Sequence, residues 1–200
     1  MLKSAIGEEG NQRIDYLILN AAGGLENNKP EDWPVQINVH SQDSLVSHFL
    51  PFMNPGGKII YLTSLWAHGY GDMKQLPAYG PIASSKNRFE REFRDRIPEL
   101  QEWGVDVGVV VGHVIKGTAA HTLFSRSAKE ELAKLEGMTE TGQFPEAADM
   151  GNAVRDMLVS GFESGHTVYV GGKNAERIQR PDRALTREEI RAILPHVWRC

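Results

Sequence analysis

Residues 57–64 read Gly57-Lys58-Ile59-Ile60-Tyr61-Leu62-Thr63-Ser64, a run of β-branched and aromatic residues that ends on hydroxyl side chains. It follows the turn residues Asn54-Pro55-Gly56. A nearly continuous apolar run of this length is typical of a strand that is buried on both faces of a parallel sheet. Similar runs occur at residues 14–20, 105–112 and 166–170.

Helical patterns occupy the gaps between these runs. Apolar residues recur at helical spacing over residues 39–53, 85–100 and 147–160, and Gly137 ends a shorter helix expected over 127–136. Strands that alternate with helices indicate βαβ units, so the predicted fold class is α/β, with a doubly wound parallel sheet in three α/β/α layers.

The composition excludes several classes of protein. The 200 residues carry a formal net charge of −4, which argues against a nucleic-acid partner, because such proteins need a basic face. The single cysteine, Cys200, excludes an intrachain disulfide framework and a cysteine-rich zinc site. The most apolar run, residues 105–115, is far shorter than the ~20 residues that span a bilayer. We therefore expect no membrane partner and a cytoplasmic location.

Motifs for other chemistries are also missing from the sequence. His40 and His48, like His113 and His121, are eight positions apart, which is not the spacing of a ligand pair on one helix, and no H-E-x-x-H occurs. We therefore expect no metal. The sequence has no G-x-S-x-G nucleophile elbow and no G-x-x-x-x-G-K-[ST] phosphate loop.

Ligands of a doubly wound sheet bind outside the carboxyl ends of its strands, so the residues that follow each run are the candidates. Asn20-Ala21-Ala22-Gly23-Gly24 follows the first run, and its small side chains either allow close approach to a ligand or form a tight turn. Thr63 and Ser64 end the second run, and a long loop then leads to Tyr79 and Lys86.

Tyr79 and Lys86 have the chemistry of an acid catalyst. Lys86 lies seven positions after Tyr79, almost two helical turns, so both side chains can face the same way. A tyrosine pKa of about 10 is too high for easy proton exchange, and a nearby ammonium would lower it. The alternative is a loop tyrosine and a lysine on a solvated helix face.

Taken together in this order, the motifs resemble those of the short-chain dehydrogenase/reductase superfamily, over Asp15 to Gly172. The resemblance implies a Rossmann-like domain over residues 1–172, followed by a C-terminal arm at 173–200. It assigns Asn20, Ala21, Ala22 and Gly23 to the border of the cofactor's adenosine half, and Gly112, His113, Val114 and Thr118 to its nicotinamide and phosphates. It gives Ser64 the role of the active-site serine, Asn38 that of a helix asparagine in a proton relay, and residues 168–172 that of the closing strand.

The spacing of the catalytic pair departs from most of that superfamily. Ile82 occupies the usual tyrosine position four residues before Lys86, whereas Tyr-x6-Lys is similar to the enoyl-acyl-carrier-protein reductases. In that branch the lysine holds the nicotinamide ribose and the tyrosine hydrogen-bonds the thioester carbonyl. The loop from Ser64 to Tyr79 is longer than usual there, and its Trp66, His68, Tyr70 and Met73 form either a substrate wall or a surface flap. Val111 stands where that superfamily usually has proline.

The superfamily's glycine-rich phosphate loop has no counterpart, because the sequence contains neither Thr-Gly-x-x-x-Gly-x-Gly nor G-x-G-x-x-G. Residues 1–13 resemble the end of the helix that leads into the family's fourth strand, so the predicted domain is truncated at its N-terminus by roughly 70–80 residues at typical element lengths. The missing part would also select NAD or NADP, and its loss would expose the edge of the first strand.

The leading prediction is an NAD(P)(H)-dependent oxidoreductase that reduces an enoyl thioester or a ketone. Tyr79, Lys86, Ser64 and Asn38 are the expected catalytic residues. The alternatives are a cofactor-free scaffold and an acid/base enzyme, such as a dehydratase, isomerase or cyclase, that has lost nucleotide binding. In the resembled superfamily, helices equivalent to 39–53 and 85–100 pair between subunits, so we expect a homodimer or homotetramer.

Overall fold

A computed structural model of the chain describes residues 13–26, 28–72, 75, 79–137, 139 and 141–171. The strands are β1 (Ile14–Leu19), β2 (Met53–Ser64), β3 (Asp106–Gly112) and β4 (His166–Val170). The helices are α1 (Trp33–Val35), η2 (Gln36–His40), α2 (Ser41–Phe49), η3 (Leu50–Phe52), α3 (Leu65–His68), α4 (Gly80–Asp95), α5 (Ile97–Glu102), α6 (Ala119–Ser127), α7 (Lys129–Glu136) and α8 (Ala147–Ser160). The expected C-terminal arm and residues 1–12 lie outside the described residues.

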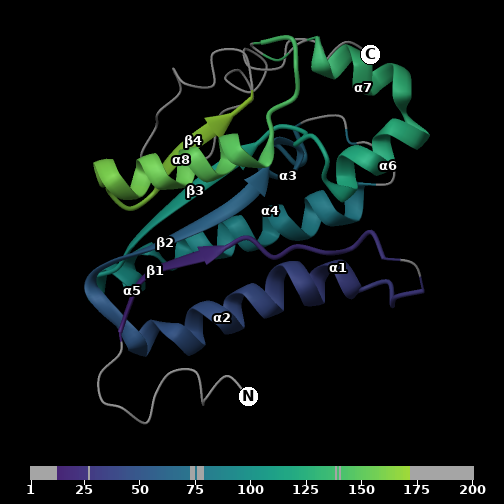
Figure 1. Ribbon diagram of the computed structural model, residues 1–200. Helices are drawn as coiled ribbons and strands as arrows, with labels where there is room; N and C mark the ends of the chain where they lie inside the picture. Colours follow the sequence, from purple (N-terminus) through teal and green to yellow (C-terminus); the bar gives the residue numbers. More distant parts are fainter. Residues whose placement is uncertain are drawn as a thin grey trace.

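The described strands form one parallel sheet in the order β1-β2-β3-β4 (Figure 1). Ile18 pairs with Ile60, Ile60 with Gly108, and Gly108 with His166, which gives one row of paired residues across the sheet. The pairing of β1 with β2 shifts register between Ile14 and Tyr16. Because every strand runs the same way, all their carboxyl ends meet at one edge. The predicted parallel α/β sheet is confirmed.

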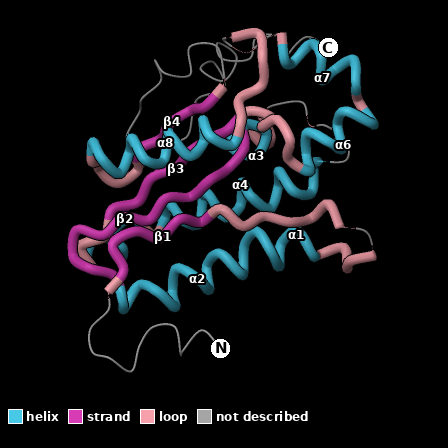
Figure 2. Tube along the Cα trace, in the orientation of Figure 1, coloured by secondary structure: helices cyan, strands magenta, loops and turns pink. Residues whose placement is uncertain are grey.

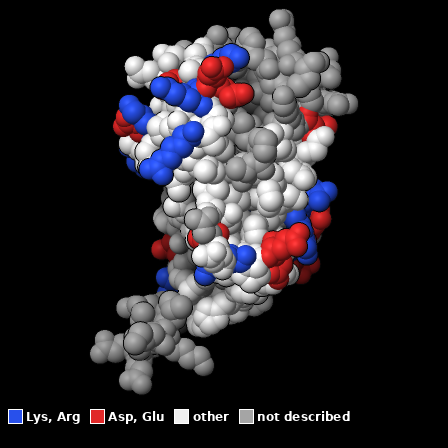
Figure 3. Space-filling view, turned by 90° about the vertical axis from the view of Figure 1, so that its right-hand side faces the viewer, with Lys and Arg blue, Asp and Glu red and all other residues white. Residues whose placement is uncertain are grey.

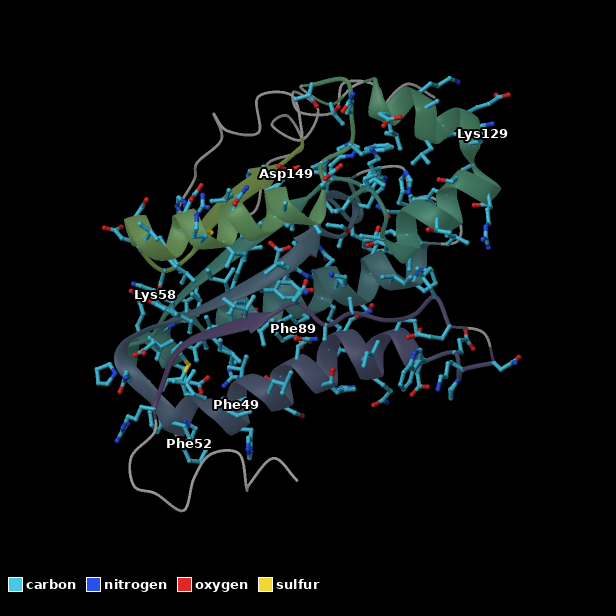
Figure 4. All side chains as sticks on the ribbon, viewed as in Figure 1. Phe49, Phe52, Lys58, Phe89, Lys129 and Asp149 are labelled. Carbon is cyan, nitrogen blue, oxygen red and sulfur yellow. The ribbon has the colours of Figure 1, made fainter. Side chains whose placement is uncertain are left out.

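Helices cover both faces of the sheet (Figure 2). α1, α2 and α4 lie on one face and α8 lies on the other. Successive residues of β2 point to opposite faces of the sheet and pack in two separate hydrophobic clusters. Tyr61 packs with Phe89 of α4, and Ile60 packs with Met157 of α8. Figure 4 shows Phe89 on the α4 side of the sheet. Burial on both faces explains why the strands are apolar without alternation.

Gly108 allows α8 to approach β3 closely. A Cβ atom at this position would lie 2.6 Å from the Cε of Met157 and 2.9 Å from the ring of Phe162. A side chain here would therefore push α8 away from the sheet.

The helix bounds differ from the expected ones where proline or a cap intervenes. The helix expected over 85–100 begins earlier, at Gly80, and breaks at Arg96, with Pro98 in the first turn of α5. The helix expected over 39–53 begins in the π-helix η2 and ends in η3, where Pro51 lies, and Met53 already belongs to β2. The sequence reading missed α6, which Thr118 caps at its N-terminus by accepting a hydrogen bond from the His121 N–H.

The outer edge of β1 is unpaired among the described residues. β1 pairs only with β2 there, and on the α8 side Tyr16 and Ile18 are 54% and 37% exposed. No helix in the described part of the chain has the length and apolar character needed to cross a membrane.

Candidate functional site

A cavity of about 550 Å³ lies at the carboxyl ends of β1, β2 and β3 and reaches α6 and α8. Its lining is mostly apolar, and Lys86 is the one charged side chain among the described lining residues. Figure 3 faces this side of the molecule and shows charged side chains gathered toward the top and bottom of the described surface, with a mainly uncharged band between them. The predicted site residues in its lining are Asn20, Ala22, Ser64, Tyr79, Lys86, Gly112, His113, Val114 and Thr118.

Tyr79 and Ser64 meet inside this cavity. The Tyr79 hydroxyl donates a hydrogen bond to Ser64 Oγ at 3.0 Å. Ser64 Oγ also accepts from the N–H of Ala67 at 3.2 Å, which caps α3 and fixes the serine in place. Both bonds use Ser64 as the acceptor, so its own O–H stays available to donate to a ligand.

Tyr79 is a neutral phenol in this environment. Burial raises its pKa above the usual value, and the hydrogen bond to Ser64 only partly opposes this. The sequence reading expected the opposite direction, from a lysine ammonium close to the phenol. The described surroundings therefore make Tyr79 a proton donor rather than a phenolate.

Lys86 is a buried cation on α4. It is 8% exposed, and its Nζ lies 5.7 Å from the centroid of the Tyr61 ring, a cation–π contact. Burial lowers its pKa to about 8, which Glu90 opposes only in part. No hydrogen bond joins its ammonium to another residue in the described part of the chain. A buried ammonium in this state is suited to a ligand that brings hydroxyl or carbonyl oxygens.

Asn38 lies behind the cavity rather than in its lining. Its Nδ2 donates to Gly23 O at 2.9 Å and to Ser85 Oγ at 3.0 Å, and its Oδ1 accepts from Gly23 N–H at 3.1 Å. These bonds tie the turn after β1 to α4 at Ser85, the residue before Lys86. Asn38 thus holds the turn and the lysine helix in a fixed relation.

The remaining predicted residues divide between lining and support. Ala21 and Gly23 do not line the cavity, and the carbonyl of Ala21 accepts from Gln42 Nε2 at 2.7 Å. Thr118 both lines the cavity and caps α6, while its Oγ1 donates to Ile115 O at 2.8 Å.

Part of the apolar wall of the cavity was not predicted from the sequence. The ring of Phe124, from α6, lies edge-on to the ring of Tyr79 with centroids 5.7 Å apart. Met150 and Val154 of α8 also line the cavity. The Thr118 cap signal would have predicted α6, but which of its residues faces Tyr79 depends on packing. Trp66, expected in either a wall or a flap, lines the cavity, and Met73 lies outside the described residues.

No second cluster of predicted site residues or metal ligands occurs elsewhere in the described ranges. A larger cavity of about 830 Å³ runs along α8 and β4, and none of the predicted site residues lines it. No group of three or more His, Cys, Asp or Glu residues is placed to hold a metal within the described ranges. At the opposite end of the sheet, Lys58 pairs with Asp106 at 2.6 Å.

Comparison with solved structures identifies the architecture. An enoyl-acyl-carrier-protein reductase (NADH) from Aquifex aeolicus superimposes with a TM-score of 0.63 and 21% identity, over 84% of this chain and 68% of that one. A 7α-hydroxysteroid dehydrogenase solved with NADH and 7-oxo glycochenodeoxycholic acid gives 0.66 and 22%, over 80% and 63%. A short-chain dehydrogenase family protein from Francisella tularensis gives 0.61 and 15%, over 78% and 68%. The chain has the short-chain dehydrogenase/reductase fold.

The structural similarity covers most of this chain but a smaller share of each dehydrogenase/reductase chain that it matches. The chain matches under two thirds of the hydroxysteroid dehydrogenase, and 58% of an enoyl-acyl-carrier-protein reductase from Plasmodium berghei. No protein-family model and no curated protein matches the sequence.

Proposed function

We propose that the chain acts as an NAD(P)(H)-dependent oxidoreductase of the short-chain type that reduces a ketone or an enoyl thioester. The observation that carries the proposal is the Tyr79–Ser64 hydrogen bond of 3.0 Å in a cavity whose one charged lining side chain, among the described residues, is Lys86. The proteins of the same fold that are described as NADH enzymes or complexes support a nicotinamide nucleotide as the cofactor.

The residues present fit one half of such a nucleotide. The buried Lys86 ammonium suits the hydroxyls of the nicotinamide ribose, and the small side chain of Ala22 lets a ligand approach the backbone. At Gly112 the corresponding space is taken by Met150, whose Sδ would lie 2.8 Å from a Cβ atom there. The diphosphate has no comparable anchor, because the sequence carries no glycine-rich phosphate loop. We therefore expect weak nucleotide binding by these 200 residues alone, with Lys86 as its main polar contact.

When bound, the nicotinamide supplies a hydride to the substrate carbon. Tyr79 and Ser64 then act on the substrate oxygen, where negative charge develops. For a ketone, Tyr79 gives its phenolic proton to that oxygen, and the Ser64 O–H donates a second hydrogen bond. For an enoyl thioester, hydride addition at the β-carbon would leave an enolate, and Tyr79 would give its phenolic proton to the enolate oxygen. The resulting enol then tautomerises, so that this proton equivalent ends on the α-carbon and the saturated thioester is formed. Trp66 and Phe124 exclude water from this end of the cavity.

Substitution of Tyr79 tests the proposed acid. Tyr79→Phe removes the phenolic proton and keeps the ring that packs on Phe124, so turnover should fall by about a hundredfold or more. Tyr70→Phe is the matched control, because Tyr70 is 39% exposed and does not line the cavity. The measurement is NADH and NADPH oxidation by the 200-residue chain with a panel of ketones and enoyl thioesters. Full activity in Tyr79→Phe would contradict the assignment.

A second candidate is an acid/base enzyme or scaffold that uses the same cavity without a nucleotide. The absent phosphate loop favours it. Such a protein would convert or bind its ligand equally well after all nucleotide has been removed, which the reductase would not.

A further inference from the structure

His113 carries a buried hydrogen-bond donor that the proposed mechanism does not use. The residue follows β3 directly and is 4% exposed. Its Nδ1 accepts a hydrogen bond from the N–H of Val114 at 2.8 Å, so the proton of the neutral ring is on Nε2. Nε2 has no hydrogen-bond partner among the described residues. An unsatisfied buried donor is costly to folding, which points to a ligand that completes it.

The surroundings of His113 define what kind of acceptor fits. It lines the cavity of Tyr79 and Ser64 and does not line the larger one. Its ring lies edge-on to Trp66, with centroids 5.2 Å apart, and 5.5 Å from the centroid of Phe144. Burial lowers the pKa of His113 to about 4, so the ring is uncharged at neutral pH. A neutral donor between aromatic rings favours an uncharged oxygen, because a carboxylate bound to it would lose its hydration and the neutral imidazole offers no charge in return.

We propose that His113 Nε2–H binds a second, uncharged oxygen of the substrate, while Tyr79 and Ser64 bind the carbonyl oxygen that is reduced. The substrate class is then a carbonyl compound with a further ester, thioester or amide carbonyl on an apolar chain. The apolar chain lies against Leu62, Met150 and Val154, which line the same cavity. The inference rests on the proposed function only in its assignment of the oxygen that reacts, because binding of an oxygen to His113 requires no nucleotide.

A pair of variants separates ligand recognition from the local role of the ring. In His113→Asn, the side-chain oxygen takes the place of Nδ1 and can still accept from Val114, but nothing replaces the Nε2 donor. In His113→Gln, the side-chain NH₂ takes the place of Nε2, and the bond to Val114 is lost. A purely local role therefore predicts that Asn is the better replacement, and a ligand-binding role predicts that Gln is.

The probes are ethyl butyrylacetate, a β-keto ester, and pentyl propyl ketone, which has the same chain length and lacks the ester oxygens. Their dissociation constants are measured by calorimetry on the 200-residue chain without nucleotide. We expect the wild-type chain and His113→Gln to bind the keto ester about tenfold more tightly than the ketone, and His113→Asn to show no preference. Equal affinities in the wild type, or a preference kept in His113→Asn, would overturn the proposal.

NMR of the wild-type chain with isotope-labelled histidine gives an answer that needs no variant to fold. The Nε2–H resonance of His113 should shift with the keto ester and not with the ketone. A shift of equal size with both probes, with neither, or with NADH alone would overturn the assignment to substrate. A preference for the keto ester without any hydride transfer would refute the proposed oxidoreductase and leave this recognition intact.

Discussion

Lys86 combines a place in the cavity lining with a cost to folding. Its ammonium is buried without a hydrogen-bond partner in the described chain, and burial lowers its pKa to about 8 from the usual 10.5. A lowering of this size corresponds to about 3 kcal/mol of free energy that opposes folding while the lysine is charged. The buried charge of Lys86 thus lowers the stability of the fold while it leaves the ammonium free to bind a ligand, a combination that is common at binding sites.

Lys86→Met should stabilise the chain at neutral pH by up to about 3 kcal/mol. The effect depends on pH, because the folded lysine loses its proton above a pH of about 8 while the unfolded lysine keeps it to about 10.5. The unfolded state then binds more protons, so the stability of the wild type rises over this window. Urea unfolding of both proteins at neutral pH and near pH ~10 should show the gap shrink. A gap that is independent of pH would contradict the burial of a charged Lys86.

The residues near the cavity also show what the sequence could and could not predict. Ser64, Tyr79 and Lys86, which the sequence motifs single out, line one cavity, because all parallel strands end at one edge. Their catalytic roles stay a prediction. The direction of the Tyr79 pKa was wrong, because burial by Phe124 and its neighbours outweighs the polar contacts. Burial of this kind depends on how distant elements pack, which spacing along the chain does not contain.

At the scale of elements, one buried polar chain joins α3, α4 and β4. Glu90 Oε1 is hydrogen-bonded to His68 Nδ1 at 2.6 Å and accepts from Arg94 at 3.0 Å. His68 Nε2 lies 3.0 Å from the Tyr169 hydroxyl, and Arg94 donates to Thr167 Oγ1 at 2.8 Å. Burial alone would raise the pKa of Glu90, but His68 and Arg94 outweigh it and lower the pKa to about 2. These buried hydrogen bonds hold α3, which carries His68, against α4 and β4.

Glu90→Gln should destabilise the fold by about 3–5 kcal/mol, because it leaves Arg94 largely buried without its carboxylate. The control is Glu92→Gln on the same helix, where the Arg88–Glu92 pair of 2.7 Å is exposed and its loss should cost under about 1 kcal/mol. Thermal or denaturant unfolding measures both. Equal effects of the two substitutions would show that the buried chain does not hold these elements together.

Element boundaries were less predictable than element types. The strands and α8 follow from apolar patterns that persist over whole elements. α5 and η3 depend on Pro98 and Pro51, which end one helix and start another within a single apolar pattern. α3 is a single turn that rests on the Ser64 cap, so it lacks the length that periodicity needs.

At the scale of the whole molecule, the described sheet ends at an unpaired β1 edge that adjoins the cavity. Ile18, Asn20 and Ala22 belong both to this edge or the turn after it and to the cavity lining. The cavity therefore borders the edge of the sheet that is unpaired among the described residues. Assembly into a homodimer or homotetramer stays a prediction.

The β1 edge, unpaired within the described part of the chain, should make the 200-residue protein prone to self-association through this strand. Tyr16→Lys places a charge on the edge at a side chain that is 54% exposed, so it should slow aggregation without a loss of folded stability. Light scattering at rising protein concentration measures the effect, with Tyr70→Lys as a control of the same chemistry away from the sheet edge. Similar aggregation of wild type and Tyr16→Lys would argue that another surface is responsible.

Transfer of deuterium from labelled NADH or NADPH to substrate tests most directly the proposal that Tyr79, Ser64 and Lys86 form a reductase site. The 200-residue chain is incubated with the labelled nucleotide and a β-keto ester or an enoyl thioester, and the product is examined by mass spectrometry. With both C4 hydrogens of the nucleotide replaced by deuterium, we expect deuterium on the reduced carbon with wild type, and about a hundredfold less in Tyr79→Phe. Product that forms without deuterium, or label transfer that is equal in Tyr79→Phe, would contradict it.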